Sequence, residues 1–269
     1  MKKEEPHRFI CGDCLEVMKN FPSDSVDLIF TDPPYNQNIP YVKKDFKDRK
    51  KPEEYLDWLK ERLKEVHRIL KDTGSLYIMN YPELNARILP FLEDELEMHL
   101  RRWIVWHYPT NVGHSKKNWT RSHRSILFLT KGKDYTFNRS EIIQPYKNPE
   151  VSKVRIRLEN GSKGRGAYDT LDIKDLLELF ELKGRPTDII KKNLLKNVRK
   201  ERKKWHACQL PPELIEIFIR VSSNPGNLVL DPFAGTFTTS MVAKKLNRKS
   251  IGIDISKKYV RYGKSRLKE

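Results

Sequence analysis

Two short stretches of this sequence combine residue types that suit chemistry on a nucleoside. The first is Asp32-Pro33-Pro34-Tyr35, which directly follows an apolar run. The two prolines fix the backbone and lack N–H donors, so carbonyl and carboxylate oxygens can accept hydrogen bonds beside an aromatic ring. Such a loop suits a planar group with an amino donor, such as adenine or cytosine. The alternative is a rigid loop between a strand and a helix.

The second stretch is DPFAGTFTT at residues 231–239, which follows another apolar run. About 20 residues later a further run ends on Asp254. In doubly wound folds, a strand, glycine loop, helix, strand and acid hold a nucleoside cofactor, and the acid binds the ribose hydroxyls. The loop is not GxGxxG and lacks the Lys of a phosphate-binding loop, so neither a dinucleotide nor a nucleoside triphosphate is favoured. The alternative for Gly235 is a tight turn.

The elements that position these stretches alternate between short apolar runs and helical patterns, which predicts a mostly parallel sheet. The predicted strands cover residues 7–12, 26–31, 75–79, 103–108, 125–130, 228–231 and 250–254. The predicted helices cover residues 13–23, 52–70, 83–92, 212–222, 238–246 and 259–267. Both chemical stretches then follow strands, where α/β sheets bind ligands.

The composition favours a cytoplasmic protein with a polyanionic partner. The chain has 269 residues, 38% of them hydrophobic, which fits one large α/β domain with or without an insertion. We expect no membrane segment, no secretory signal and, with three cysteines, a reducing compartment. No metal site is predicted, because Cys11 and Cys14 lack a second pair. The net charge of +17 favours nucleic acid; the alternative is a merely lysine-rich surface.

A basic segment interrupts the α/β pattern between residues 138 and 205. Within residues 183–204, ten Lys and Arg face two acids, a net charge of +8. Helical patterns cover residues 173–182 and 188–203. The segment reads as an inserted basic module, and the alternative is a solvated helix face.

These motifs together resemble the S-adenosylmethionine-dependent amino-methyltransferases of DNA. DPPY is the catalytic tetrapeptide of that family, and DPFAG resembles its cofactor loop. The order, with DPPY first, is that of the circularly permuted β group. The resemblance covers about residues 8–137 and 206–267 but not the basic segment, which is the variable target-recognition region in the family.

The resemblance implies a Rossmann-like α/β methyltransferase fold. Its seven-stranded, mostly parallel sheet would have helices on both faces, with the strands that end at Asp231 and Asp32 side by side. The chain would divide into a catalytic part (residues 1–137), a target-recognition insertion (138–205) and a cofactor-binding part (206–269). The double-stranded DNA substrate, a cognate restriction endonuclease and a homodimer are the expected partners.

The resemblance also implies a role for each site residue. Asp32 and the Pro33 carbonyl would hold the amino group, Pro34 would complete the rigid loop, and Tyr35 would stack on a target base flipped out of the duplex. Residues expected to bind S-adenosylmethionine are Asp13 (adenine), Asp254 (ribose), Gln209 (methionine carboxylate), Asp231, Phe233, Ala234, Gly235, Thr238 and Thr239. The alternatives are a helix N-cap for Asp13 and a solvated turn for Gln209.

The same resemblance implies a target base and a set of DNA contacts. DPPY is commoner among N6-adenine enzymes, so methylation of adenine is predicted. The alternatives are N4-cytosine methylation and a non-catalytic DNA-binding protein. Residues expected to contact DNA are Lys192, Arg199 and Lys203 in the basic segment, and Lys116, Lys117 and Arg121 in a second basic loop that also holds His114 and Arg124.

Phe237 departs from the family pattern. Many relatives read G-[ST]-G-T-T in the cofactor loop, whereas this chain has Phe at the third of these positions. If that position requires a positive φ, Phe237 is strained by about 1–2 kcal/mol. Either residue 237 is an ordinary helical N-terminus here, or the affinity for the cofactor is altered.

Overall fold

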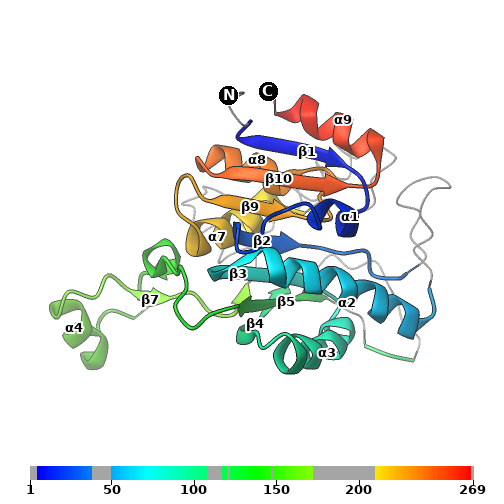
Figure 1. Ribbon diagram of the computed structural model, residues 1–269. Helices are drawn as coiled ribbons and strands as arrows, with labels where there is room; N and C mark the ends of the chain where they lie inside the picture. The colour runs from blue at the N-terminus through cyan, green and yellow to red at the C-terminus, as the bar shows by residue number, and fades with distance from the viewer. Residues whose placement is uncertain are drawn as a thin grey trace.

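An eight-stranded sheet runs through the molecule in the order β1-β10-β9-β2-β3-β5-β4-β8 (Figure 1). The computed structural model describes residues 5–37, 50–107, 117–119, 122–146, 148–171 and 210–267. The strands are β1 (His7–Cys11), β2 (Val26–Thr31), β3 (Leu70–Asn80), β4 (His99–His107), β5 (His123–Thr130), β8 (Thr170–Leu171), β9 (Leu228–Asp231) and β10 (Lys249–Asp254). Strands β1, β10, β9, β2 and β3 are parallel, and β5 is antiparallel to both β3 and β4.

Helices cover both faces of the sheet. One face carries α1 (Cys14–Met18), α2 (Pro52–Ile69), α3 (Pro82–Pro90) and a π-helical turn η1 (Phe91–Glu95), and the other carries α7 (Pro212–Ser222), α8 (Thr238–Lys245) and α9 (Lys257–Arg266). Helix α2 shows why these segments are helical. It has Pro in its first turn, acids near its N-terminus and bases near its C-terminus, which match the helix dipole.

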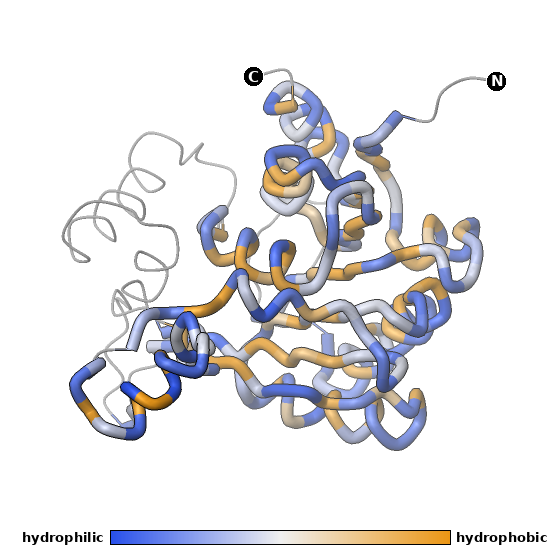
Figure 2. Tube along the Cα trace, turned by 90° about the vertical axis from the view of Figure 1, so that its left-hand side faces the viewer, coloured by the Kyte–Doolittle hydropathy of each residue, from blue (hydrophilic) through white to orange (hydrophobic). Residues whose placement is uncertain are grey.

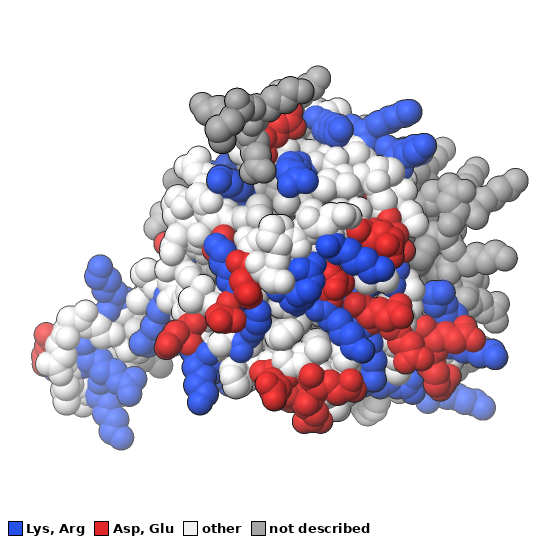
Figure 3. All heavy atoms as spheres, in the orientation of Figure 1, with Lys and Arg blue, Asp and Glu red and all other residues white. Residues whose placement is uncertain are grey.

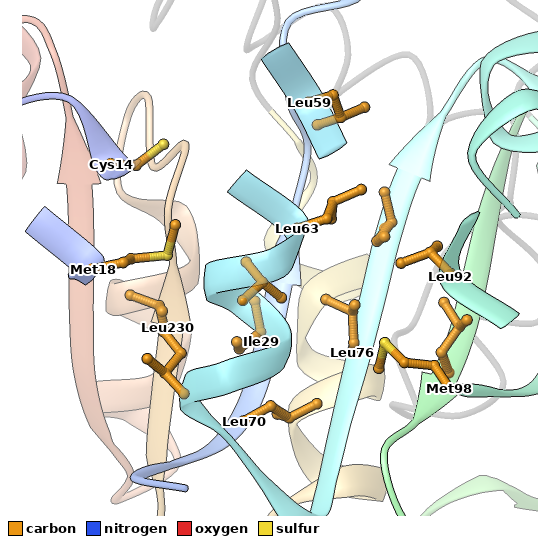
Figure 4. Close-up of a cluster of buried hydrophobic side chains, with 14 of the residues drawn as sticks. Cys14, Met18, Ile29, Leu59, Leu63, Leu70, Leu76, Leu92, Met98 and Leu230 are labelled. Atoms are coloured by element: carbon orange, nitrogen blue, oxygen red, sulfur yellow. The ribbon is translucent and has the colours of Figure 1, made fainter. Parts of the chain in front are cut away.

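The hydrophobic core has one layer on each side of the sheet. Figure 2 shows apolar residues along the central strands, with polar residues on the outer turns. In the layer beneath α1 and α2, buried side chains such as Met18, Ile29, Leu63 and Leu230 pack together (Figure 4). The second layer lies beneath α7 and α8 and includes Phe30, Tyr77 and Phe218. Residues 28–30 of β2 and 76–79 of β3 alternate between the two layers, so these parts of the central strands are continuously apolar.

All seven predicted strands are present, and the predicted ranges of β2, β9 and α7 match the observed ones. Two differences have physical causes. Strand β3 begins at Leu70 rather than residue 75, because Leu70 pairs with Val26 before the register shifts. The eighth strand, β8, has only two residues and pairs with Val105 and Trp106 of β4 at the sheet edge. No helix in the described ranges is both long and apolar enough to cross a membrane.

The described part of the basic segment contains η2 (Arg139–Ile142), β6 (Ile143–Gln144), α4 (Ser152–Glu159), β7 (Arg165–Gly166) and β8. Helix α4 projects from the body of the molecule and buries none of its residues (Figure 1). Lys and Arg side chains gather on this projection, at the lower left of Figure 3, whereas the body mixes both signs of charge. The predicted helices at 173–182 and 188–203 lie outside the described residues.

Candidate active site

The order of the sheet reverses between β2 and β9. These two strands are parallel neighbours, with Leu28 opposite Val229 and Ile29 opposite Leu230, as predicted for the strands that end at Asp32 and Asp231. From this pair the sheet continues to β10 and β1 on one side and to β3 on the other. Such a reversal opens a crevice at the carboxyl ends of the strands.

A pocket fills that crevice and joins both chemical stretches. Its empty space is about 1040 Å³, including solvent open to the outside. Asp32 and Pro34 of the tetrapeptide line it. Every predicted cofactor residue that the structure describes lines it too, namely Asp13, Asp231, Phe233, Ala234, Gly235, Thr238, Thr239 and Asp254. Residues about 200 positions apart in the sequence therefore share one pocket, which has the mixed polar and apolar lining of a small-molecule site.

Two carboxylates shape the loop between β9 and α8. Asp254 accepts hydrogen bonds from the backbone N–H of Gly235 (2.9 Å) and Ser256 (2.7 Å). Asp231 accepts from the Phe233 N–H (3.1 Å) and the Thr239 hydroxyl (2.6 Å). Asp231 thus braces the loop that it precedes, while Asp254 ties that loop to the end of β10.

Burial raises the pKa of all three carboxyls at these strand ends. The pKa of Asp32 rises to about 7, that of Asp231 to about 7 and that of Asp254 to about 6. Hydrogen bonds oppose the rise at each residue, but desolvation outweighs them. A cationic ligand would stabilise the ionised carboxylates, so the lining of this pocket suits a positively charged ligand.

Phe237 has a left-handed backbone, with φ 61° and ψ 33°, at the N-cap of α8. Of the two alternatives for this position, an ordinary helical N-terminus is therefore wrong. The ring is fully buried with Ala234, Tyr259, Val260 and Phe9. Burying a Phe side chain contributes about 1.5–3 kcal/mol, which offsets the 1–2 kcal/mol that a left-handed residue costs.

Arg62 and Trp58 of α2 are among the pocket residues that were absent from the sequence predictions. The buried Arg62 guanidinium donates to both carboxylate oxygens of Asp13, at 2.9 and 2.7 Å. It also lies 4.1 Å from the centre of the Trp58 ring, and that ring lines the pocket beside Phe233. Asp13 also caps α1 through the Leu15 N–H, which was the alternative for this residue. Nothing in the local pattern signals this ion pair, because Asp13 and Arg62 are 49 positions apart.

The acceptor oxygens of the tetrapeptide after β2 differ in whether they already accept a hydrogen bond within the protein. The Asp32 carboxylate accepts a hydrogen bond from the Tyr35 hydroxyl, and the Pro34 carbonyl accepts one from Tyr55 at 2.6 Å. Within the described residues, no hydrogen bond reaches the Pro33 carbonyl. Tyr35 is 4% exposed, so its ring is packed inside the protein rather than presented at the surface.

Arg124 does not lie in the second basic loop, where it was predicted to lie. It is the second residue of β5, and its guanidinium lies over the rings of Tyr35 (5.2 Å) and Tyr81 (4.3 Å). Lys117 is described and exposed. The other predicted residues of these groups lie outside the described ranges: Gln209, His114, Lys116, Arg121, Lys192, Arg199 and Lys203. Among the described residues, no cluster of His, Cys, Asp or Glu could hold a metal ion.

Comparison with protein families gives one decisive match. The model of the N6/N4 methyltransferase family, described as DNA methylase, matches residues 26–265. This chain belongs to that DNA methylase family. The match spans both motifs and the segment between them.

Curated relatives of this DNA methylase align along nearly its whole length. The chain is 34% identical to the type II methyltransferase M.HpaI of Haemophilus parainfluenzae, over 97% of this chain and 74% of the relative. It is 35% identical to the DNA adenine methyltransferase YhdJ of Escherichia coli K12, over 98% of this chain and 85% of the relative.

Solved structures confirm the Rossmann-like methyltransferase fold. The PvuII DNA methyltransferase (cytosine-N4-specific) superimposes with a TM-score of 0.67 at 21% identity, over 99% of this chain and 89% of that one. A complex of M1.HpyAVI with S-adenosylmethionine gives 0.58 at 22% identity, over 97% and 100%. This enzyme uses S-adenosylmethionine as its cofactor. The pocket fits that group, because buried carboxylates suit a cation and aromatic rings suit a purine.

Proposed function

We propose that this DNA methylase methylates the N6 amino group of adenine at specific sites in duplex DNA. The observation that carries the proposal is the position of Asp32, which lines the same pocket as the loop at residues 231–236 and Asp254. An adenine inside a duplex cannot reach such a crevice, so the target base must flip out of the helix.

Two acceptors would hold and orient the amino group. The Asp32 carboxylate and the Pro33 carbonyl are fixed by the rigid proline pair, and each can accept one amino hydrogen. Their directions would draw the nitrogen toward a tetrahedral shape and aim its lone pair into the cofactor pocket. Orientation and charge placement would thus supply much of the catalysis. Asp32 can also take up the proton that the nitrogen later releases.

The cofactor pocket has groups for each end of S-adenosylmethionine. When bound, this group supplies the methyl on a sulfonium centre. Asp254 would bind the ribose hydroxyls, and Asp13 with Trp58 would lie at the adenine. Phe233, Ala234, Gly235 and the hydroxyls of Thr238 and Thr239 would surround the methionine portion, with Gln209 near its carboxylate.

The choice of adenine has two supports. The tetrapeptide is DPPY, and the E. coli relative at 35% identity is named a DNA adenine methyltransferase. N4-cytosine methylation is the competing activity, because the same two acceptors can hold either amino group. Similarity to M.HpaI, a type II methyltransferase, supports a role in a restriction-modification system with a cognate endonuclease.

DNA binding would use the basic insertion and the loop that contains Lys117. We assign residues 138–205 to target recognition, with Lys192, Arg199 and Lys203 on phosphates, and Lys116, Lys117 and Arg121 near the flipped nucleotide. Helix α4 carries three of the described bases of this insertion, Lys153, Arg155 and Arg157, and projects away from the sheet (Figure 3). A projecting basic element can reach a groove that the flat end of a sheet cannot.

Sequencing with modified-base detection on DNA exposed to the enzyme tests the proposal. DNA from a host without methylases should acquire methylated adenine within one recurring sequence. The Asp32→Ala variant should bind this DNA but leave it unmodified. Methylated cytosine, or DNA binding by the wild type with no modification, would refute the proposal.

A further inference from the structure

Three strand ends converge beside the catalytic loop. Asp32 follows β2, which is a parallel neighbour of β3 with Thr31 opposite Ile78. Tyr81 follows β3 directly. Strand β5 runs antiparallel to β3, with Asn80 opposite Ser125, so its N-terminal end lies at the carboxyl edge of the parallel strands. That reversed direction brings Arg124, the residue before Ser125, to the edge where Asp32 and Tyr81 lie.

Aromatic and cationic groups at this point form a stack. The rings of Tyr35 and Tyr81 lie with centroids 4.7 Å apart and an angle of 46° between their planes. The Arg124 guanidinium lies over both rings and donates to the Tyr81 hydroxyl at 3.4 Å. Tyr35 in turn donates its hydroxyl proton to Asp32. Arg124 is thereby connected through Tyr35 to the proposed catalytic carboxylate.

The charges that face Asp32 come from three elements. Tyr35 lies on the same loop, Arg124 on β5, and Asp231 at the end of β9. Tyr35 stays neutral, because burial raises its pKa well above the ordinary value. Arg124 lowers the pKa of Asp32, whereas the like charge of Asp231 raises it. Among the described residues, Arg124 is therefore the cation that opposes both desolvation and Asp231 at this carboxyl.

We infer that Arg124 is a positioning residue of the methyl-transfer site, which fixes the Tyr35 ring and keeps the Asp32 carboxylate ionised near neutral pH. This inference rests on the proposed function, because it assumes that ionised Asp32 accepts the amino group. Arg124 acts through Tyr35 and Asp32 and need not touch the base or the cofactor. A neutral side chain at position 124 would leave Asp32 protonated over a wider pH range.

The test is the pH dependence of methyl transfer from tritiated S-adenosylmethionine to phage DNA grown without methylases. For Arg124→Gln, the acid limb of the kcat/KM profile should shift to higher pH. Each pH unit of this shift should lower kcat/KM about tenfold at pH 6 but have little effect at pH 9. Arg124→Lys should restore part of the limb, since it keeps the charge. Arg101→Gln is the matched control, because Arg101 stacks on Tyr135 near Thr130, at the other end of β5. A loss by the same factor at every pH would overturn the inference.

Thermal unfolding tests the same contact without catalysis. At pH 8 Asp32 is ionised, so Arg124→Gln should lower the Tm more in the wild-type background than in Asp32→Asn. At pH 4 Asp32 is protonated, and the two backgrounds should respond alike. Equal responses at both pH values would contradict the inference. If the wild type transfers no methyl group, the proposed function fails, and this measurement still decides the role of Arg124.

Discussion

Asp32 is the residue on which the proposed chemistry depends, and the burial of its carboxyl makes its ionisation sensitive to pH. Its pKa of about 7 in the folded protein exceeds the value of about 3.9 in an unfolded chain. The folded state therefore binds this proton more tightly. The stability that this group contributes is complete below pH 4 and is lost as the pH rises to 7. The proposed mechanism needs the ionised form, so in this mechanism the site loses stability in exchange for function.

An Asp32→Asn variant should reveal this trade. Because Asn stays neutral, the Tm of the variant minus that of the wild type should be more positive at pH 8 than at pH 4. Scanning calorimetry at both values measures it. Asp134→Asn, at an exposed position, is the control and should show no such trend. A difference independent of pH would show that Asp32 is not desolvated as described.

Trp58 should contribute to binding of the cofactor. Its ring lines the pocket and is held by the buried Arg62, so Trp58→Leu removes an aromatic wall and the stacking partner of a cation. Aromatic contacts are worth about 0.5–1.5 kcal/mol beyond burial, and 1.4 kcal/mol is tenfold in Kd. Titration calorimetry with S-adenosylmethionine should show about tenfold weaker binding. Trp103→Leu, at a partly buried position that packs against the core outside the pocket, should not change Kd. Equal Kd values for all three proteins would contradict this role.

At the scale of elements, two glycines make room for the start of α8. A Cβ added at Gly252 of β10 or Gly263 of α9 would approach the Phe237 ring to 2.6 or 2.5 Å. Helix α9 thus packs against β1 and the cofactor loop only because these positions lack side chains. The two glycines leave the space in which the Phe237 ring is buried, and this burial stabilises the left-handed backbone of Phe237.

Gly263→Ala should destabilise the protein although Ala favours helices. Overpacking of this kind costs about 1–3 kcal/mol, and a domain of this size loses about 2–4 °C in Tm per kcal/mol. The cost should shrink in the Phe237→Gly background, where the ring is absent. Gly166→Ala has open space around it and serves as the control. Equal costs of Gly263→Ala in both backgrounds would disprove the contact.

Elements were predictable where apolar periodicity was strong. The ranges of β2 and α7 matched because both are apolar runs with clear ends, Pro33 after one and Pro211 before the other. The first residues of β3 are polar, and β8 is two residues long, so neither gave a signal. The conformation of Phe237 and the stacking of Arg124 depend on residues far away in the sequence. Local reasoning placed Arg124 with its basic neighbours and so missed its side-chain contacts.

For the whole molecule, the topology explains why the motifs lie so far apart in the chain. Permutation places β9 and β10 after β5 in sequence yet inserts them between β1 and β2 in the sheet. The pairing of β9 with β2 was predicted from the resemblance to the DNA amino-methyltransferases, whose fold places these two strands side by side. The oligomeric state and the DNA recognition sequence could not be predicted, because no comparable motif in the amino-acid sequence indicates them.

Within the net charge of +17, the acidic and basic residues gather in different parts of the molecule. Acids line the pocket at the strand ends, while bases dominate the projecting segment (Figure 3). DNA affinity should therefore fall steeply with salt. Neutralising Lys116 and Lys117 to Gln should reduce the slope of log K against log salt by up to about 1.8, and Lys249→Gln at the opposite sheet edge should leave it unchanged. An unaltered slope in the double variant would remove this loop from the DNA interface.

The most direct test of the central claim is mass spectrometry of nucleosides from DNA treated with the enzyme and methyl-deuterated S-adenosylmethionine. The account predicts deuterated N6-methyladenine with the wild type and a loss of at least about 100-fold with Asp32→Ala, comparable to the removal of a key polar group elsewhere. Deuterated N4-methylcytosine in its place, or undiminished N6-methyladenine from Asp32→Ala, would contradict it.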